Sequence, residues 1–215
     1  MRLYKHLHDE IAFVDDDFFL TEAIINVDVE SYLKPLKDWE IETEINQCED
    51  TSCFISILNR IYNKKNIYFY IKPNSKYSGK TLKSGKINIF LGINSLLLYN
   101  TKKDKFIEKI KIILEHELIH REQSKKINWD NYHIKHPVNK TEYLANKQEI
   151  MAYAKSIVDQ LHKKFIVNKK ILDFLQSPTK GESNYLDQYI ENFGNDDKAI
   201  KRLYKYMYEY LIKDE

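Results

Sequence analysis

The stretch that decides the fold is Ile112-Ile113-Leu114-Glu115-His116-Glu117-Leu118-Ile119-His120-Arg121-Glu122-Gln123. On a helix, His116 and His120 lie one turn apart on the same face, because they are separated by four residues. Both imidazoles can then reach one tetrahedral metal ion. Glu117 projects beside that ion, where its carboxylate can take a proton from metal-bound water.

The surroundings of this pentapeptide predict one long helix over residues 104–127. Apolar side chains precede it at three-and-four spacing, and no Pro or Gly interrupts the range. Asp104 is the expected N-cap, and Lys125 and Lys126 suit the negative end of the helix dipole. The alternative is an ordinary amphipathic helix that carries two surface histidines.

The pentapeptide resembles the active-site helix of the zincin superfamily of zinc metallopeptidases, in which gluzincins use a glutamate as third ligand. The resemblance covers this helix and the next one, about a quarter of the chain. It implies that His116 and His120 bind Zn²⁺ and that Glu117 is the general base.

A catalytic zinc site needs a third protein ligand, and Glu149 is the preferred candidate. Ala145 and Ala152 flank it at i−4 and i+3, and such small side chains would let a second helix approach closely. The run Glu149-Ile150-Met151-Ala152 also resembles the Glu-x-x-Ala sequence around the third ligand of gluzincin-like proteins. The alternatives that stay open are Glu142, His133 and His136.

The first half of the chain predicts an α+β fold with a small mixed sheet. A helix is expected over 52–62, strands over 67–71 and 87–91, and a Gly/Ser/Lys loop over 73–86. Strand, loop, strand and metal helix follow one another as in the N-terminal part of zincins. That resemblance implies that 87–92 is an edge strand, able to pair with an extended peptide substrate.

The second half of the chain is predicted to be helical. An irregular segment over 127–138 precedes a long helix at 141–164, capped by Asn139 or Thr141, and further helices follow at 167–176, 183–193 and 195–213. We therefore expect a zincin-like metallopeptidase domain over 1–165 and a helical extension over 166–215, whose tyrosines pack in its core.

Composition narrows the partners and the compartment. With 34 basic and 32 acidic residues the net charge is +2, and the lysines look scattered, so a nucleic-acid partner is not expected. No apolar run is long enough for a membrane span, and the N-terminus lacks an apolar signal core. A cytoplasmic protein is expected, with free thiols at Cys48 and Cys53 favoured over the alternative of a disulfide between them. The abundance of Lys, Ile, Asn and Tyr is typical of AT-rich genomes, such as those of phages, viruses and low-GC bacteria. For a viral protein the expected compartment would be the host cytoplasm.

Two functions follow from these residues. The first is a zinc metallopeptidase that hydrolyses a peptide or protein substrate, and the second is an inactive or regulatory zincin-fold protein that binds a protein partner. Second-sphere carboxylates could come from Glu122 or Asp130. Candidate donors to the developing oxyanion are Tyr132, His133, His136 and Tyr153.

Overall fold

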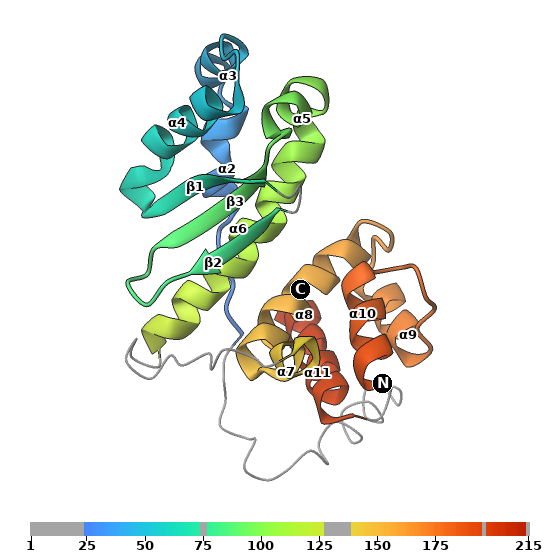
Figure 1. Ribbon diagram of the computed structural model, residues 1–215. Helices are drawn as coiled ribbons and strands as arrows, with labels where there is room; N and C mark the ends of the chain where they lie inside the picture. Colours follow the sequence, from blue (N-terminus) through green and yellow to red (C-terminus); the bar gives the residue numbers. More distant parts are fainter. Residues whose placement is uncertain (1–23, 74–76, 127–138, 195–196, 214–215) are drawn as a thin grey trace. The chain divides into compact units, whose positions relative to one another are not determined.

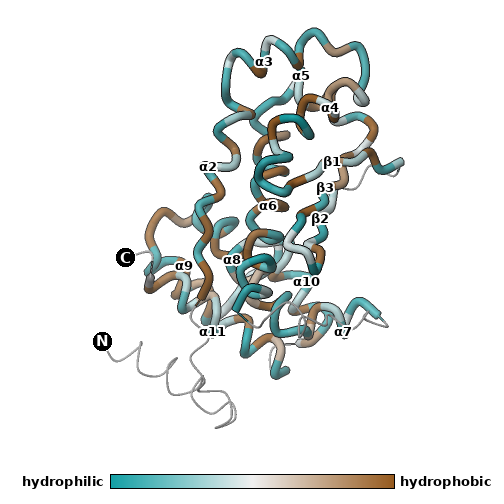
Figure 2. The backbone as a smooth tube through the Cα atoms, turned by 90° about the vertical axis from the view of Figure 1, so that its left-hand side faces the viewer, coloured by the Kyte–Doolittle hydropathy of each residue, from teal (hydrophilic) through white to brown (hydrophobic). Residues whose placement is uncertain are grey.

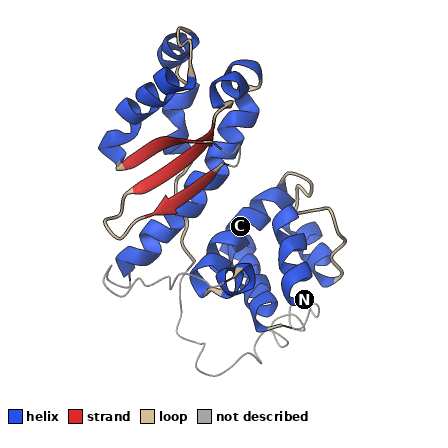
Figure 3. Ribbon diagram, viewed as in Figure 1, coloured by secondary structure: helices blue, strands red, loops and turns tan. Residues whose placement is uncertain are grey.

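The computed structural model describes residues 24–73, 77–126, 139–194 and 197–213 (Figure 1). Contacts divide the chain into two compact units, residues 25–133 and residues 1–24 with 134–215. The fold is mixed α+β, as expected, with all described strands in the first of these units (Figure 3). The predicted metallopeptidase domain boundary at residue 165 stays a prediction.

The unit of residues 25–133, here called the sheet unit, begins with short helices. They are α2 (Glu30–Leu33), η2 (Lys34–Lys37), α3 (Trp39–Asn46), α4 (Thr51–Tyr62) and η3 (Asn63–Lys65). Pro35 stands in the first turn of η2, where its missing N–H leaves no bond unmade. The helix predicted at 52–62 is confirmed as α4, whose N-cap is Asp50.

The sheet contains β1 (Ile67–Lys72), β2 (Ser78–Thr81) and β3 (Ile87–Gly92) in the order β1-β3-β2. Both predicted strands are confirmed, but the predicted loop at 73–86 contains β2. Strand β3 pairs parallel with β1 and antiparallel with β2, so it is central. The expectation that 87–92 is an edge strand is wrong, and β2 occupies that place beside the long helix.

The register gives the sheet two different faces. Ile67, Phe69, Ile87, Ile89 and Leu91 point inward and are buried, and they belong to the core that α4, α5 (Ser95–Thr101) and α6 (Lys103–Lys126) share. A cluster of three aromatic rings from these helices, Phe54, Tyr99 and Phe106, lies at its centre, with centroids 5.4–5.5 Å apart. The tube coloured by hydropathy shows the apolar segments along α6 and α4 (Figure 2).

Helix α4 also covers the free edge of β1. The Asn59 side chain donates to the Phe69 carbonyl oxygen at 3.0 Å and accepts from the Phe69 backbone N–H at 2.6 Å. These two bonds replace those that a neighbouring strand would make in the middle of β1, so both backbone groups are satisfied.

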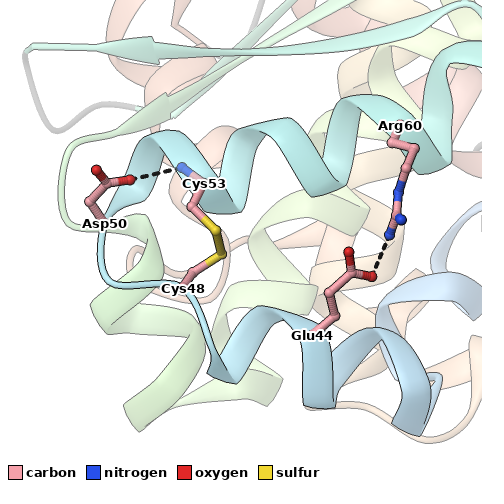
Figure 4. Close-up of a disulfide and its surroundings, with 5 residues drawn as sticks. All are labelled: Glu44, Cys48, Asp50, Cys53 and Arg60. Carbon is pink, nitrogen blue, oxygen red and sulfur yellow. Dashed lines mark hydrogen bonds and ion pairs between the residues drawn. A yellow bond between two sulfur atoms is a disulfide. The ribbon is translucent and has the colours of Figure 1, made fainter.

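Two sequence-based expectations in the sheet unit need correction. Cys48 and Cys53 form a disulfide rather than free thiols, with the bond at the start of α4 beside Asp50 (Figure 4). Asp104 lies inside the first turn of α6, which begins at Lys103, so it is not the N-cap. Its carboxylate still interacts favourably with the N-terminal end of the helix dipole.

The other unit, here called the helical unit, contains α7 (Lys140–Ala145), α8 (Lys147–His162), α9 (Asn168–Gln176), α10 (Asn184–Phe193) and α11 (Lys198–Lys213). Helix α8 packs along α11. The long helix predicted at 141–164 is wrong in one respect, because it is broken at Asn146. The backbone there is extended, and the Asn146 side chain accepts from the Gln148 N–H as the N-cap of α8. Asn139 caps α7, as expected.

Tyrosines fill the core of the helical unit, as the sequence predicts. Tyr189, Tyr206 and Tyr210 are buried. The Tyr189 hydroxyl donates to the Leu144 carbonyl oxygen at 3.0 Å, which satisfies the polar end of a ring in apolar surroundings. Burial raises the pKa of Tyr189 above its ordinary value, and the nearby charges of Tyr153 and Glu149 raise it further.

Candidate metal centre

His116 and His120 are brought together on α6. Their Nε2 atoms lie 3.0 Å apart, and their rings are nearly perpendicular, with centroids separated by 4.6 Å. Two nitrogen ligands of a tetrahedral zinc ion, each about 2.0–2.1 Å from the metal, lie about 3.3 Å apart. The paired ring nitrogens therefore have the spacing that one metal ion requires, after a shift of a few tenths of an ångström.

The second ring nitrogen of His120 has a fixed partner. Its Nδ1 lies 2.9 Å from the amide oxygen of Gln123, and both side chains are buried. Because an amide oxygen accepts, Nδ1 carries the proton, and the lone pair of Nε2 is left for a metal. The Ser124 hydroxyl donates to the His120 carbonyl oxygen at 2.6 Å.

Of the two candidate second-sphere carboxylates, Glu122 and Asp130, only Glu122 lies within the described residues. Glu122 forms an ion pair with Lys125 at 2.6 Å on the surface. Gln123 supplies the acceptor to His120 instead. It follows His120 by three residues, so helical spacing alone could have identified it.

Glu117 is buried, with 6% of its surface exposed, on the side of α6 that faces β2. The Thr81 hydroxyl lies 2.7 Å from the Glu117 carboxylate and 2.8 Å from the Glu117 backbone carbonyl oxygen. Its single hydrogen is shared between these two acceptors. Strand β2 therefore holds both the main chain and the carboxylate of the predicted base.

Gly79 makes this close approach possible. A Cβ atom at residue 79 would lie 2.4 Å from Cγ of Glu117 and 2.8 Å from Cγ2 of Ile113. Real Cβ atoms essentially never come so near to other heavy atoms, so a side chain here would displace Glu117 or the strand. Sequence reasoning missed both Gly79 and Thr81, because a short run of Ser, Gly, Lys and Thr resembles a loop.

Glu149 occupies the third position of α8 in the helical unit, with 2% of its surface exposed. Glu149 is therefore not an ordinary solvent-exposed helix glutamate. Ala152 lies on the same helix and is fully buried, but Ala145 belongs to α7 and is exposed. The prediction that Ala145 flanks Glu149 on one helix face is thus wrong, because the break at Asn146 places Ala145 on another helix.

Among the alternative ligands and donors, Glu142 is exposed in the first turn of α7. A position in water makes it a poorer candidate for a metal ligand than the buried Glu149. The Tyr153 ring packs between those of Tyr185 and Tyr189, at centroid distances of 5.2 and 5.7 Å. The remaining candidates, Asp130, Tyr132, His133 and His136, lie outside the described residues.

Comparison of this chain with protein families, with curated proteins and with solved structures finds no match. Across the described residues, no helix combines the length and the apolar character that crossing a bilayer demands.

Proposed function

We propose that this chain is a zinc-dependent metallopeptidase of the zincin type, which hydrolyses a peptide or protein substrate. The observation that carries the proposal is the pair of imidazole nitrogens 3.0 Å apart on α6, on the same helix as a buried glutamate between them in sequence. Two imidazole nitrogens at this spacing can bind one metal ion, and a carboxylate on the same helix can serve as the base for a metal-bound water.

Glu149 is the third ligand in this proposal. Its carboxylate is buried, which favours it over the exposed Glu142. In this proposal His116 and His120 supply two imidazole ligands, and Glu149 supplies the carboxylate. Two imidazoles and one carboxylate are the protein ligands of one class of catalytic zinc site, in which the fourth position is left to water.

The chemistry follows from these roles. Zinc held by His116, His120 and Glu149 would lower the pKa of a coordinated water and would polarise the scissile carbonyl group. Glu117 accepts the proton of the attacking water and later passes it to the leaving amine. Thr81 holds the Glu117 carboxylate through its hydroxyl, and Gly79 leaves room for it. Gln123 keeps the His120 ring in the tautomer that presents Nε2.

The test compares zinc content and peptide hydrolysis in matched variants. We expect Glu117→Gln to retain the fold and stoichiometric zinc but to lose hydrolysis of a casein substrate. His116→Ala and Glu149→Gln should lose zinc, measured by mass spectrometry of the metal. Glu122→Gln makes the same chemical change on a partly exposed residue of the same helix, and it should behave as the wild type.

Retained turnover in Glu117→Gln would exclude this mechanism. Loss of zinc in His116→Ala without loss in Glu149→Gln would remove Glu149 from the ligand set and leave the pair of histidines. A wild-type chain that binds zinc but cleaves no peptide in a mixed peptide library would instead favour the regulatory zincin-fold alternative.

A further inference from the structure

The outer face of the sheet presents aromatic rings and lysines together. The register places residues of all three strands on this one face: Tyr68, Tyr70 and Lys72 of β1, Asn88 and Phe90 of β3, and Ser78 and Lys80 of β2. Lys86, which directly precedes β3, continues the same alternation. We call this set the outer face. It is opposite to the inward side chains and to α6, and so it is separate from the candidate metal centre.

The rings of the outer face are accessible and arranged for stacking. Tyr70 is 44% exposed, and its ring lies against that of Phe90 with centroids 5.7 Å apart and an interplanar angle of 30°. Tyr68 and Phe90 are half-buried. Aromatic rings that lie together at the surface of a sheet form a contiguous apolar area, and such areas are typical of interaction sites.

The lysines stand beside these rings. The Lys72 Nζ lies 5.9 Å from the Phe90 centroid, and the Lys86 Nζ lies 5.5 Å from the Tyr68 centroid. Lys80 and Lys86 are exposed. Within the described part of the chain, no carboxylate forms an ion pair with any of these three ammonium groups. The outer face therefore carries uncompensated positive charge next to flat apolar surfaces.

The sequence around the sheet is segregated in charge, although the whole chain is nearly neutral. Residues 51–103 contain no Asp or Glu, whereas a segment of that length would carry about eight at the average frequency of the chain. The same segment contains Arg60, Lys64, Lys65, Lys72, Lys76, Lys80, Lys83, Lys86, Lys102 and Lys103. The basic residues are present at about the average frequency of the chain, so the absence of acidic residues is what makes this segment basic.

We propose that the outer face binds single-stranded nucleic acid. Exposed aromatic side chains on a sheet provide planar surfaces on which unpaired bases stack, and neighbouring lysines neutralise the phosphates. Acidic peptides would use the charges but not the stacked rings, and an apolar partner would use the rings but not the charges. The two features together favour a ligand that is both planar and anionic, contrary to the expectation from net charge alone.

The test uses the full chain and a fluorescein-labelled oligothymidylate of about 20 nucleotides, with binding followed by fluorescence anisotropy over a range of KCl concentrations. The wild type should bind it and should bind an abasic strand of equal length at least tenfold more weakly. Tyr70→Ala should weaken binding by about 5- to 150-fold, which corresponds to the loss of one stacked base, whereas Tyr70→Phe should retain it.

Salt dependence tests the charges separately. The pair Lys80→Gln and Lys86→Gln should reduce the slope of log affinity against log salt by about 1.4, because each phosphate contact on a single strand contributes about 0.7. The matched control, Lys169→Gln with Lys170→Gln, removes two exposed lysines from α9 in the helical unit and should leave the slope unchanged. Glu117→Gln should bind as the wild type, since the metal centre is not involved.

Three results would each overturn the proposal. The first is no binding of the oligothymidylate by the wild type. The second is equal affinity for the abasic strand, which needs no variant to fold and would leave the rings without a role. The third is competition by polyglutamate as effective as that by unlabelled oligothymidylate, which would indicate a surface that selects only for negative charge.

Discussion

Replacing Gly79 by alanine tests whether β2 positions the proposed base. The added Cβ would lie 2.4 Å from Cγ of Glu117, 2.7 Å from its Oε1 and 2.8 Å from Cγ2 of Ile113. Ordinary contacts between carbon atoms are about 3.5–4.0 Å long, so Glu117 or the strand must move by about 1 Å. Overpacking of this kind destabilises a protein by about 1–3 kcal/mol.

The same movement should affect catalysis more strongly than stability. A catalytic group displaced by about 1 Å lowers the rate by about 100-fold, because the reacting atoms no longer meet in the required geometry. We therefore expect Gly79→Ala to lose about two orders of magnitude in kcat on a peptide substrate. Its zinc content should stay that of the wild type, since Glu117 is the proposed base and not one of the proposed ligands His116, His120 and Glu149.

The assay measures thermal unfolding, zinc content and kcat for Gly79→Ala and for Ser78→Ala. Ser78 neighbours Gly79 on β2 but points to the outer face, so its substitution should change stability by less than about 0.5 kcal/mol. Wild-type stability and turnover in Gly79→Ala would refute the close contact. Lowered stability with wild-type kcat would instead show that the position of Glu117 does not govern the reaction.

Three further predictions concern other contacts of the sheet unit. Thr81→Val removes the hydroxyl that donates to the Glu117 carboxylate; we expect kcat to fall by about tenfold or more, as for loss of a hydrogen bond to a charged group, and Thr81→Ser to restore it. The Cys48–Cys53 disulfide closes a short loop, so Cys48→Ala with Cys53→Ala should lower the unfolding free energy by about 2 kcal/mol; a reductant should lower the melting temperature of the wild type equally and leave the variant unchanged, and no effect of reduction would contradict the bond. Hydrogen bonds from Lys111 and Lys37 lower the pKa of Glu30 from 4.5 to about 2, so its contribution is complete above pH 4.5 and is lost as the pH falls through about 2; Glu30→Gln should lose less than about 1 kcal/mol at pH 7, since the pair is half-exposed, and the difference from the wild type should vanish at the lowest pH in acid titrations of stability.

The elements with strong periodicity could be predicted from the sequence. Apolar residues recur at three-and-four spacing in the long helix around His116 and His120. They alternate with other residues in the strands at 67–71 and 87–91. The spacing of the two histidines also predicted that their rings share one face. Local patterns were sufficient here because each of these elements buries its own apolar face.

The elements that depend on distant contacts could not be predicted in this way. Strand β2 has no apolar alternation of its own; it is placed by pairing with β3 and by the fit of Gly79 over Glu117. The sequence pattern is helical on both sides of Asn146, so it does not reveal the break. The break forms because the Asn146 side chain accepts from the Gln148 N–H and so begins a new helix. The disulfide depends on how the chain turns between Cys48 and Cys53, which spacing alone leaves open.

The disulfide also bears on where the protein acts. Such bonds form and persist in oxidising compartments and are rare in the cytosol of most organisms. The expected cytoplasmic location stays a prediction, and the bond between Cys48 and Cys53 weighs against it. Mass spectrometry of the chain isolated without reductant from its own source would decide the matter.

The amide of Asn59 has a consequence for self-association. The Asn59 side chain binds both the N–H and the carbonyl oxygen of Phe69 in the middle of β1. These groups are then not available for pairing with a strand of another chain. A single side chain thereby blocks strand addition at the β1 edge of the sheet. Its removal should therefore increase the tendency of the protein to form fibres.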